Sequence, residues 1–168
     1  MPLRIPNKEI QNVFRQDVWT YFSDKVDNIY VRDLVTALWT GEIRKAEAAL
    51  NQILEAALSF YHEYHEYSYH LILDGFFTGL GYRVQSERET GYGRSDLIIL
   101  HPARNRCMIL ELKHVREEDM MEEALKEAES QIIRKKYDSQ LKYEGYTNLV
   151  RYGMAFCGKK VLIGNSFA

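Results

Sequence analysis

The stretch YGRSDLIILHPARNRCMILELKHV, residues Tyr92–Val115, contains two apolar runs that are separated by a short polar link. The runs DLIIL and MILELK are typical of buried strands, and the link HPARNR is typical of the turn between them. The first run begins with Asp96, and the second contains Glu111 and Lys113. A buried charge is costly unless it is paired, hydrogen-bonded or bound to a metal. These three residues are therefore the first candidates for a functional site.

The register of this predicted hairpin places the three charged residues together. A hairpin centred between Ala103 and Arg104 puts Asp96 opposite Glu111. Opposed residues have Cβ atoms about 4.5–5.5 Å apart, so two carboxylates there repel each other unless a positive charge lies between them. Glu111 and Lys113 are two residues apart and share one face of the strand. We expect two acids and an amine at one end of the sheet.

Two carboxylates and a lysine in this arrangement suit metal-assisted phosphodiester chemistry. Carboxylate oxygens are good ligands for a hard cation such as Mg²⁺, with Mn²⁺ as the alternative. A bound cation can activate water and stabilise charge on a phosphate, and a neighbouring lysine can orient the water. The pattern is short, so an ordinary cross-strand salt bridge near a sheet edge is the competing interpretation.

The composition is that of one globular domain. Apolar residues make up 46% and charged residues 27% of the 168 residues. No apolar run approaches the roughly 20 residues of a membrane span, and the N-terminus lacks the apolar core of a signal peptide. We interpret Cys107 and Cys157 as buried free thiols, which predicts a reducing, cytoplasmic location. The net charge of −2 lacks the basic footprint of many nucleic-acid-binding proteins.

The hydrophobic period changes from helical to strand-like at Tyr82. We expect helices over residues 8–22, 28–37, 44–58 and 61–79, with Thr40 as a helix cap, then strands over 82–89, 95–101 and 106–114. A long helix over 117–143 and two strands around a turn at Gly158 complete the chain. This order predicts an α/β fold, a mixed β-sheet flanked by helices, in domain 59–168 after a helical lead-in, 1–58.

The segments GYGRSDLIIL and CMILELK resemble the PD-(D/E)xK nuclease superfamily, with Asp96, Glu111 and Lys113 on its three motif positions. The segments EYSYHLILDGFFTGLGY, ALKEAESQIIRKKY and YGMAFCGKKV resemble, in order, one bacterial family in which such a domain usually follows an AAA-ATPase-like domain. The resemblance implies a restriction-endonuclease-like fold and metal-dependent cleavage of nucleic acid, with DNA preferred. Ser95 replaces the superfamily's usual proline, and no GxxxxGK[ST] phosphate loop occurs.

The resemblance also implies a further acidic residue on the helix before the first core strand. Glu66 fits this position as a catalytic and metal-binding residue, with Glu63 as its competitor, and Glu87 could extend the acidic cluster. His62, Glu66 and His70 share one helical face, which leaves a zinc site as an alternative. An exposed, aromatic-rich helix face is the simpler interpretation.

Three further residues are candidates for contacts with nucleic acid. Gln131 and Lys135 lie four residues apart on the long helix, on the face that the resemblance places over the active site. Tyr137 follows Gln131 by six residues, so the QxxxY signature of one nuclease branch is not met. Arg94 falls opposite Lys113 in the predicted register, and a phosphate between the two cations would relieve their repulsion. A solvated basic end of the helix is the competing interpretation for the segment IIRKKY, and a solvated turn residue is the competing interpretation for Arg94.

A non-catalytic interaction module that keeps the nuclease fold, accessory to an ATPase, is the second hypothesis. The negative net charge and the acidic segment EEDMMEEALKEAE favour protein contacts over DNA. The partners that stay open are an ATPase-like domain or protein, in cis or in trans, and a second copy of the chain in a homodimer. The intact set of Asp96, Glu111 and Lys113 favours the enzyme, since an interaction module has no physical need of it.

Overall fold

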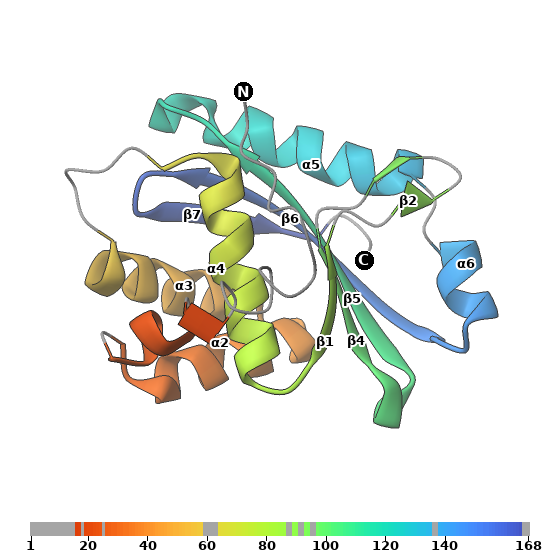
Figure 1. Cartoon of the computed structure of the whole chain (residues 1–168). Coiled ribbons are helices and arrows are strands. Elements are labelled where there is room, and N and C mark those ends of the chain that lie inside the picture. The colour runs from red at the N-terminus through yellow and green to blue at the C-terminus, as the bar shows by residue number, and fades with distance from the viewer. Residues whose placement is uncertain are drawn as a thin grey trace.

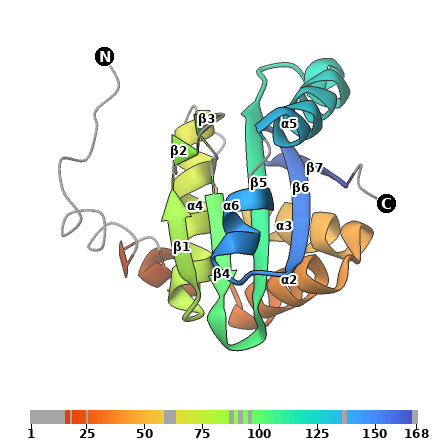
Figure 2. The same ribbon diagram turned by 90° about the vertical axis from the view of Figure 1, so that its right-hand side faces the viewer.

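The computed structural model (Figure 1) describes residues 16–17, 19–24, 26–58, 64–86, 89–90, 93–94, 97–135 and 138–165. Its centre is a five-stranded sheet in the order β1-β4-β5-β6-β7. The strands are β1 (Arg83–Ser86), β4 (Leu97–His101), β5 (Arg106–His114), β6 (Asn148–Cys157) and β7 (Lys160–Gly164). Figure 2 shows β1, β4, β5 and β6 side by side in that order.

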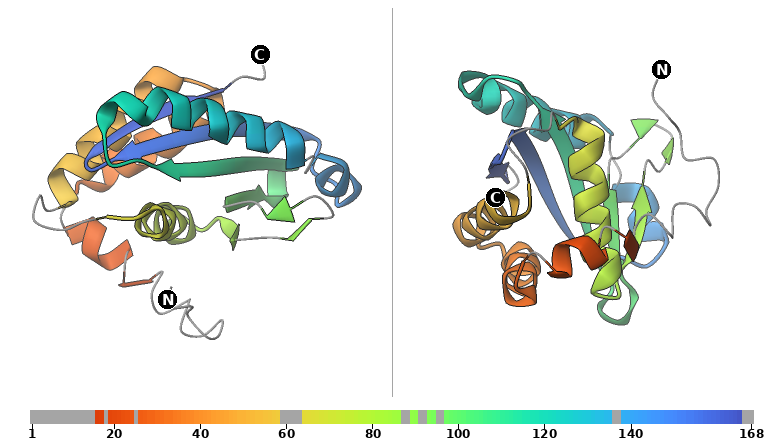
Figure 3. Two further views of the ribbon diagram at one scale, coloured as in Figure 1. Left: turned by 90° about the horizontal axis from the view of Figure 1, so that it is seen from above. Right: turned by 60° about the vertical axis from the view of Figure 1, so that its left-hand side comes forward.

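Helices cover both faces of this sheet. The helices are α2 (Asn28–Thr40), α3 (Ile43–Ala57), α4 (Glu66–Gly79), α5 (Met121–Lys135) and α6 (Asp138–Tyr143), and residues 19–24 are also helical. Short 3₁₀ turns cover Pro102–Arg104 and Glu118–Met120, and a separate two-stranded ribbon pairs β2 (Glu89–Thr90) with β3 (Gly93–Arg94). In Figure 3, left, α4 and α5 lie on opposite sides of the sheet.

The pairing of the strands confirms the predicted mixed sheet. β4 and β5 form an antiparallel hairpin, in which Leu97 pairs with Leu110 and His101 with Arg106. This is the predicted register, and β5 has the predicted bounds. β5 and β6 are parallel, and α5 and α6 form the crossover between them. The fold is therefore α/β, a mixed sheet with flanking helices, consistent with a restriction-endonuclease-like fold.

Alternate residues of each strand face two different layers. Leu97, Ile99, Met108 and Leu110 belong to a large apolar cluster that includes buried residues of α2, α3 and α4. Their neighbours Ile98, Leu100, Cys107 and Ile109 pack instead with Ile132 of α5 and Leu141 of α6. The N-terminal helices thus share one core with the sheet, while the predicted domain boundary at residue 58 stays a prediction.

Two predictions about the helices were wrong. The helix expected over 117–143 is divided into a 3₁₀ turn, α5 and α6. The second helix is fixed separately, because Asp138 pairs with Arg151 of β6 and Leu141 is buried. Thr40 does not cap α3, because it is the last residue of α2 and its hydroxyl donates to the Thr36 carbonyl at 2.9 Å. Gly41, at φ 79°, then closes α2 in the left-handed conformation.

Candidate active site

Glu111 is a buried carboxylate in the strand β5, with 2% of its surface exposed. Cys107 and Ile109, on the same strand, pack with Ile132 of α5. Strand alternation therefore directs Glu111 and Lys113 to the α5 face. Both motif residues consequently lie beneath α5, on the face opposite α4.

The apolar packing on this face is interrupted where Glu111 lies. One small cluster, around Ile98, Leu100 and Ile109, fills the end near the hairpin. A second, around Met121, Ala124 and Ala155, fills the other end. Glu111 and Lys113 occupy β5 after the first cluster ends. A carboxylate and an amine between two apolar clusters cost stability unless they are paired, so this interruption marks the candidate site.

Lys113 is held by a residue that the sequence analysis did not single out. Its Nζ lies 3.5 Å from Oε1 of Glu127 on α5, and the Lys113 side chain is 20% exposed. Gln131, one turn later, donates from Nε2 to the same Oε1 at 3.2 Å. Oε1 of Glu127 thus contacts both Lys113 and Gln131, which was predicted to contact nucleic acid. The only sequence signal for Glu127 was its spacing of four residues from Gln131.

α5 comes close to the sheet at a glycine beside Glu111. Gly153 of β6 pairs with Glu111 in the parallel register. A Cβ at Gly153 would lie 3.2 Å from the Ala128 Cβ and 3.0 Å from the Glu129 Cγ. The small residues Gly153 and Ala128 therefore permit the approach that brings Glu127 and Gln131 over Lys113.

Several predicted site residues lie outside the described residues. These are Asp96, Glu63, His62 and Glu87. The β4–β5 register is the one from which the pairing of Asp96 with Glu111 was predicted, and it is observed from Leu97 onward. Lys135 is the last residue of α5, so its backbone is helical, as predicted. The roles of Asp96 and Lys135 stay predictions.

Arg94 differs from its predicted pairing. Within the described residues the hairpin pairs run from Leu97 to His101, and Arg94 pairs with Glu89 in the separate β2–β3 ribbon. The strand pairing that placed Arg94 opposite Lys113 was therefore wrong. The sheet register does not extend to Gly93–Arg94, because these residues form their own two-residue ladder. A contact between Arg94 and nucleic acid stays a prediction.

Glu66 lies on the other layer of the fold. It is the first residue of α4 and is exposed. The ring of the preceding residue, His65, lies 6.3 Å from that of His114, which directly follows Lys113. The N-terminal end of α4 therefore lies near the end of β5 that carries the motif. His70, from the zinc alternative, is 7% exposed and stacks on Tyr67 at 5.9 Å.

The donor set fits a hard divalent cation better than zinc. Glu111 supplies a buried carboxylate, and the predicted partner Asp96 would supply a second. Oxygen ligands of this kind suit Mg²⁺ or Mn²⁺. Among the described residues, which exclude Asp96, no group of three or more His, Cys, Asp or Glu side chains could hold a metal ion.

A comparison with protein families matches residues 64–166 to the PD-(D/E)XK nuclease superfamily. The chain belongs to this superfamily. The match covers the α4 helix, the whole five-stranded sheet and α5, the elements that surround Glu111 and Lys113. No curated protein matches the chain in a sequence comparison. None of the helices within the described ranges is long and apolar enough to cross a membrane.

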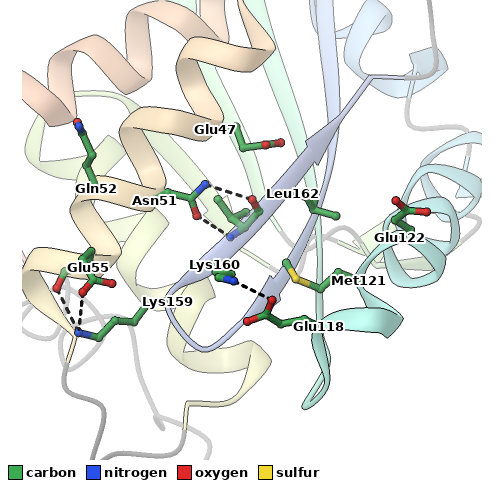
Figure 4. Close-up of a pocket in the computed structure, with 11 residues that line it drawn as sticks. Glu47, Asn51, Gln52, Glu55, Glu118, Met121, Glu122, Lys159, Lys160 and Leu162 are labelled. Carbon is green, nitrogen blue, oxygen red and sulfur yellow. Dashed lines mark hydrogen bonds and ion pairs between the residues drawn. The ribbon is translucent and has the colours of Figure 1, made fainter.

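A cleft of about 590 Å³ lies elsewhere in the chain (Figure 4), between α3 and the edge strand β7. Its polar side chains come from α3, from Lys159 and Lys160 around the start of β7, and from Glu118 and Glu122 around the start of α5. Lys159 Nζ lies 3.8 Å from Glu55 Oε1. Lys160 Nζ donates a hydrogen bond to Glu118 Oε2 at 2.7 Å, and this bond raises the pKa of Lys160. Of the predicted site residues whose side chains the structure describes, Glu66, Glu111, Lys113 and Gln131 all lie outside the lining of this cleft.

Proposed function

We propose that the chain is a metal-dependent nuclease that hydrolyses phosphodiester bonds, with DNA as its preferred substrate. The observation that carries this proposal is the interrupted face of the sheet, where Glu111 and Lys113 lie under α5. Membership of the nuclease superfamily supports it. Placing a carboxylate and an ammonium between apolar clusters costs desolvation free energy, and a chemical role for the two groups accounts for that cost.

The proposed roles follow from the chemistry of each side chain. Asp96 and Glu111 would hold a divalent cation such as Mg²⁺ or Mn²⁺, and Glu66 would complete its ligand shell. When bound, this cation supplies water activation and charge stabilisation. The Lys113 ammonium would donate to the attacking water or to a phosphate oxygen. Arg94, Gln131 and Lys135 would contact phosphates of the bound strand.

The test is cleavage by the full chain of supercoiled plasmid, single-stranded DNA and RNA, with Mg²⁺, with Mn²⁺ and with EDTA. We expect metal-dependent cleavage that Asp96→Ala abolishes. Asp33→Ala, which removes an exposed aspartate on α2, is the matched control and should cleave normally. Cleavage that persists in EDTA, or equal cleavage by Asp96→Ala, would show that the site is not this one. The RNA arm decides between the two nucleic acids.

Metal binding provides a second, independent measurement. Calorimetry with Mn²⁺ should detect binding to the wild-type chain and lose it in Asp96→Asn, because the amide removes a charged oxygen ligand. Equal binding by both proteins would count against the assignment of Asp96.

A non-catalytic interaction module is the second candidate, and the cleft in Figure 4 favours it. Four glutamates line this cleft with two lysines, around the apolar residues Met121, Val161 and Leu162. Four glutamates against two lysines give the cleft a net negative lining, which repels phosphates and suits a protein partner better than DNA. The absence of cleavage with either metal and all three substrates would favour this function.

The cellular context follows from the same proposal. Cys107 and Cys157 are not joined in a disulfide, which supports a reducing compartment such as the cytoplasm; Cys107 is buried as expected, whereas Cys157 is only half-buried. An ATPase-like partner, in cis or in trans, and a homodimer are further proposals. Light scattering at several protein concentrations tests the homodimer.

A further inference from the structure

We propose that Glu127 is a positioning residue that fixes the Lys113 ammonium for catalysis. This inference rests on the proposed nuclease function. It concerns a residue outside the Asp96, Glu111 and Lys113 motif, on a different element of the fold. Glu127 would act through Lys113 and would not itself contact the nucleic acid or the cation.

The geometry places Glu127 between two functional candidates. Its Oε1 lies 3.5 Å from Lys113 Nζ and accepts a hydrogen bond from Gln131 Nε2 at 3.2 Å. The Gln131 side chain therefore restrains the carboxylate that faces the lysine. The Glu127 side chain is 57% exposed, so it approaches Lys113 from the solvent side, whereas Glu111, two residues earlier on β5, is buried.

A catalytic lysine needs such a partner. Lysine carries its charge on a flexible four-carbon stem, and an unrestrained ammonium samples many positions. Catalytic groups must be held close to their productive geometry by packing and by supporting hydrogen bonds, and small displacements cost rate. Glu127 lies on a helix that packs tightly at Ala128, the next residue, against Gly153. The carboxylate that holds Lys113 therefore lies on α5, a helix that is itself fixed by close packing against the sheet.

A different result is expected if the ion pair between Lys113 and Glu127 has only a structural role. An ion pair this exposed contributes little to stability because solvent screens it. Removing Glu127 should therefore shift the melting temperature by no more than about 4 °C. A large change in cleavage without a large change in melting would separate positioning from structure.

The kinetic test compares four variants of the full chain on a fluorescent DNA substrate with Mg²⁺. We expect Glu127→Ala to lower kcat roughly tenfold with KM nearly unchanged, because the lysine acts in the transition state. Glu127→Gln should fall between wild type and Glu127→Ala, and Glu127→Asp should recover part of the rate. Glu123→Gln removes an exposed charge one turn earlier on α5 and should leave kcat unchanged.

A double-mutant cycle shows whether Glu127 acts through Lys113. In a Lys113→Met background, Glu127→Ala should cause no further loss of the residual cleavage. An equal loss in both backgrounds would mean that Glu127 acts independently, and would overturn the proposal. A rise in kcat in Glu127→Ala would also overturn it, because Glu127 would then restrain the lysine unproductively.

A measurement without substrate separates this inference from the nuclease proposal. The order parameter of the Lys113 Cε methylene, measured by NMR, should be high in the wild type and lower in Glu127→Gln. If the wild type cleaves no nucleic acid but Lys113 loses order in Glu127→Gln, the nuclease function fails and the positioning contact stands. If the order parameter is the same in both proteins, the positioning role is wrong even where cleavage is observed.

Discussion

The two faces of the sheet are built differently. Toward α2, α3 and α4 the strands present one continuous apolar cluster, which includes Phe76, Phe77, Tyr152 and Phe156. Toward α5 and α6 the apolar residues form two smaller clusters, and Glu111 with Lys113 follows the first of them. Burial of apolar side chains supplies most of the favourable free energy of folding. The difference indicates that the α4 face stabilises the fold, and it supports the proposal that the α5 face carries the site.

A second buried carboxylate shows that burial alone does not mark a site. Asp74 of α4 is 2% exposed, as is Glu111. Its Oδ1 accepts a hydrogen bond from Thr78 and its Oδ2 one from Ser86, both at 3.0 Å, so this acid joins α4 to β1. Glu111 instead shares its face with Lys113, which reaches α5 through Glu127. A lysine two residues away on the same face distinguishes the candidate site from a structural acid.

The largest expected effect is on the α4 face. Phe76 is fully buried, and its ring contacts that of Phe22 edge-to-face at 5.1 Å. Phe76→Ala should lower the free energy of unfolding by about 3–5 kcal/mol, because it removes apolar contacts and leaves a cavity. Urea unfolding measures this loss. A loss under about 1 kcal/mol would mean that the cluster collapses around the cavity and is not a tightly packed core.

The second effect is on the α5 face and should appear in catalysis. Lys113→Ala should lower the cleavage rate by about 10²–10³, the usual consequence of losing one group that stabilises the transition state. Its stability should fall by only about 0–1 kcal/mol, because the pair with Glu127 is partly exposed. Lys126→Ala, on the exposed side of α5, is the matched control. Normal cleavage with a lowered melting temperature would make Lys113 a structural salt-bridge partner.

The sheet was the more predictable part of the fold. The alternation and length of residues 106–114 gave the bounds of β5, and the short polar link gave the register of the hairpin. The division between α5 and α6 could not be predicted, because the helical period continues across it. It depends on an ion pair between Asp138 of α6 and Arg151 of β6, which are 13 residues apart in the sequence but adjacent in space.

The shared face of the candidate site residues was predictable only where they lie on one strand. Glu111 and Lys113 were found because strand alternation fixes a shared face. Glu127 was not found, because the rotation of α5 relative to the sheet is set by packing at Gly153 and Ala128. The pairing of Arg94 was wrong because a continuous register was assumed where the chain forms a separate ribbon.

The third effect tests the close approach of α5. Gly153→Ala would put a Cβ within 3.2 Å of the Glu129 backbone nitrogen and of the Ala128 Cβ, so the helix itself must move. We expect a loss of about 1–3 kcal/mol and slower cleavage, because Glu127 moves with α5. Gly164→Ala is the matched control. Its nearest contact is the end of the flexible Glu129 side chain, which can turn away. Equal losses in both variants would contradict the packing argument.

The smallest effect returns to the α4 face and depends on pH. Tyr69 is 1% exposed, stacks on Phe156 at 4.3 Å and donates its hydroxyl to the Gly158 carbonyl at 2.6 Å. Burial, with smaller contributions from Cys157 and Tyr64, raises the pKa of Tyr69 to about 12. The unfolded chain titrates near 10, so the folded state keeps this proton longer. The stabilisation by Tyr69 is therefore complete below pH 10 and is lost as the pH rises toward 12.

Tyr69→Phe isolates this titration from that of the other tyrosines. Between pH 10 and 12 the free energy of unfolding of the wild type should fall more steeply than that of Tyr69→Phe, by at most about 1.4 kcal/mol per pH unit for one proton. Urea unfolding from pH 8 to 11.5 measures both slopes. Tyr152→Phe is a useful comparison, because burial also raises the pKa of Tyr152, whose hydroxyl donates to the Leu38 carbonyl at 2.6 Å. Parallel curves for wild type and Tyr69→Phe would mean that solvent reaches the Tyr69 hydroxyl. The apolar packing on the α4 face would then be looser around Tyr69 than its contact with Phe156 indicates.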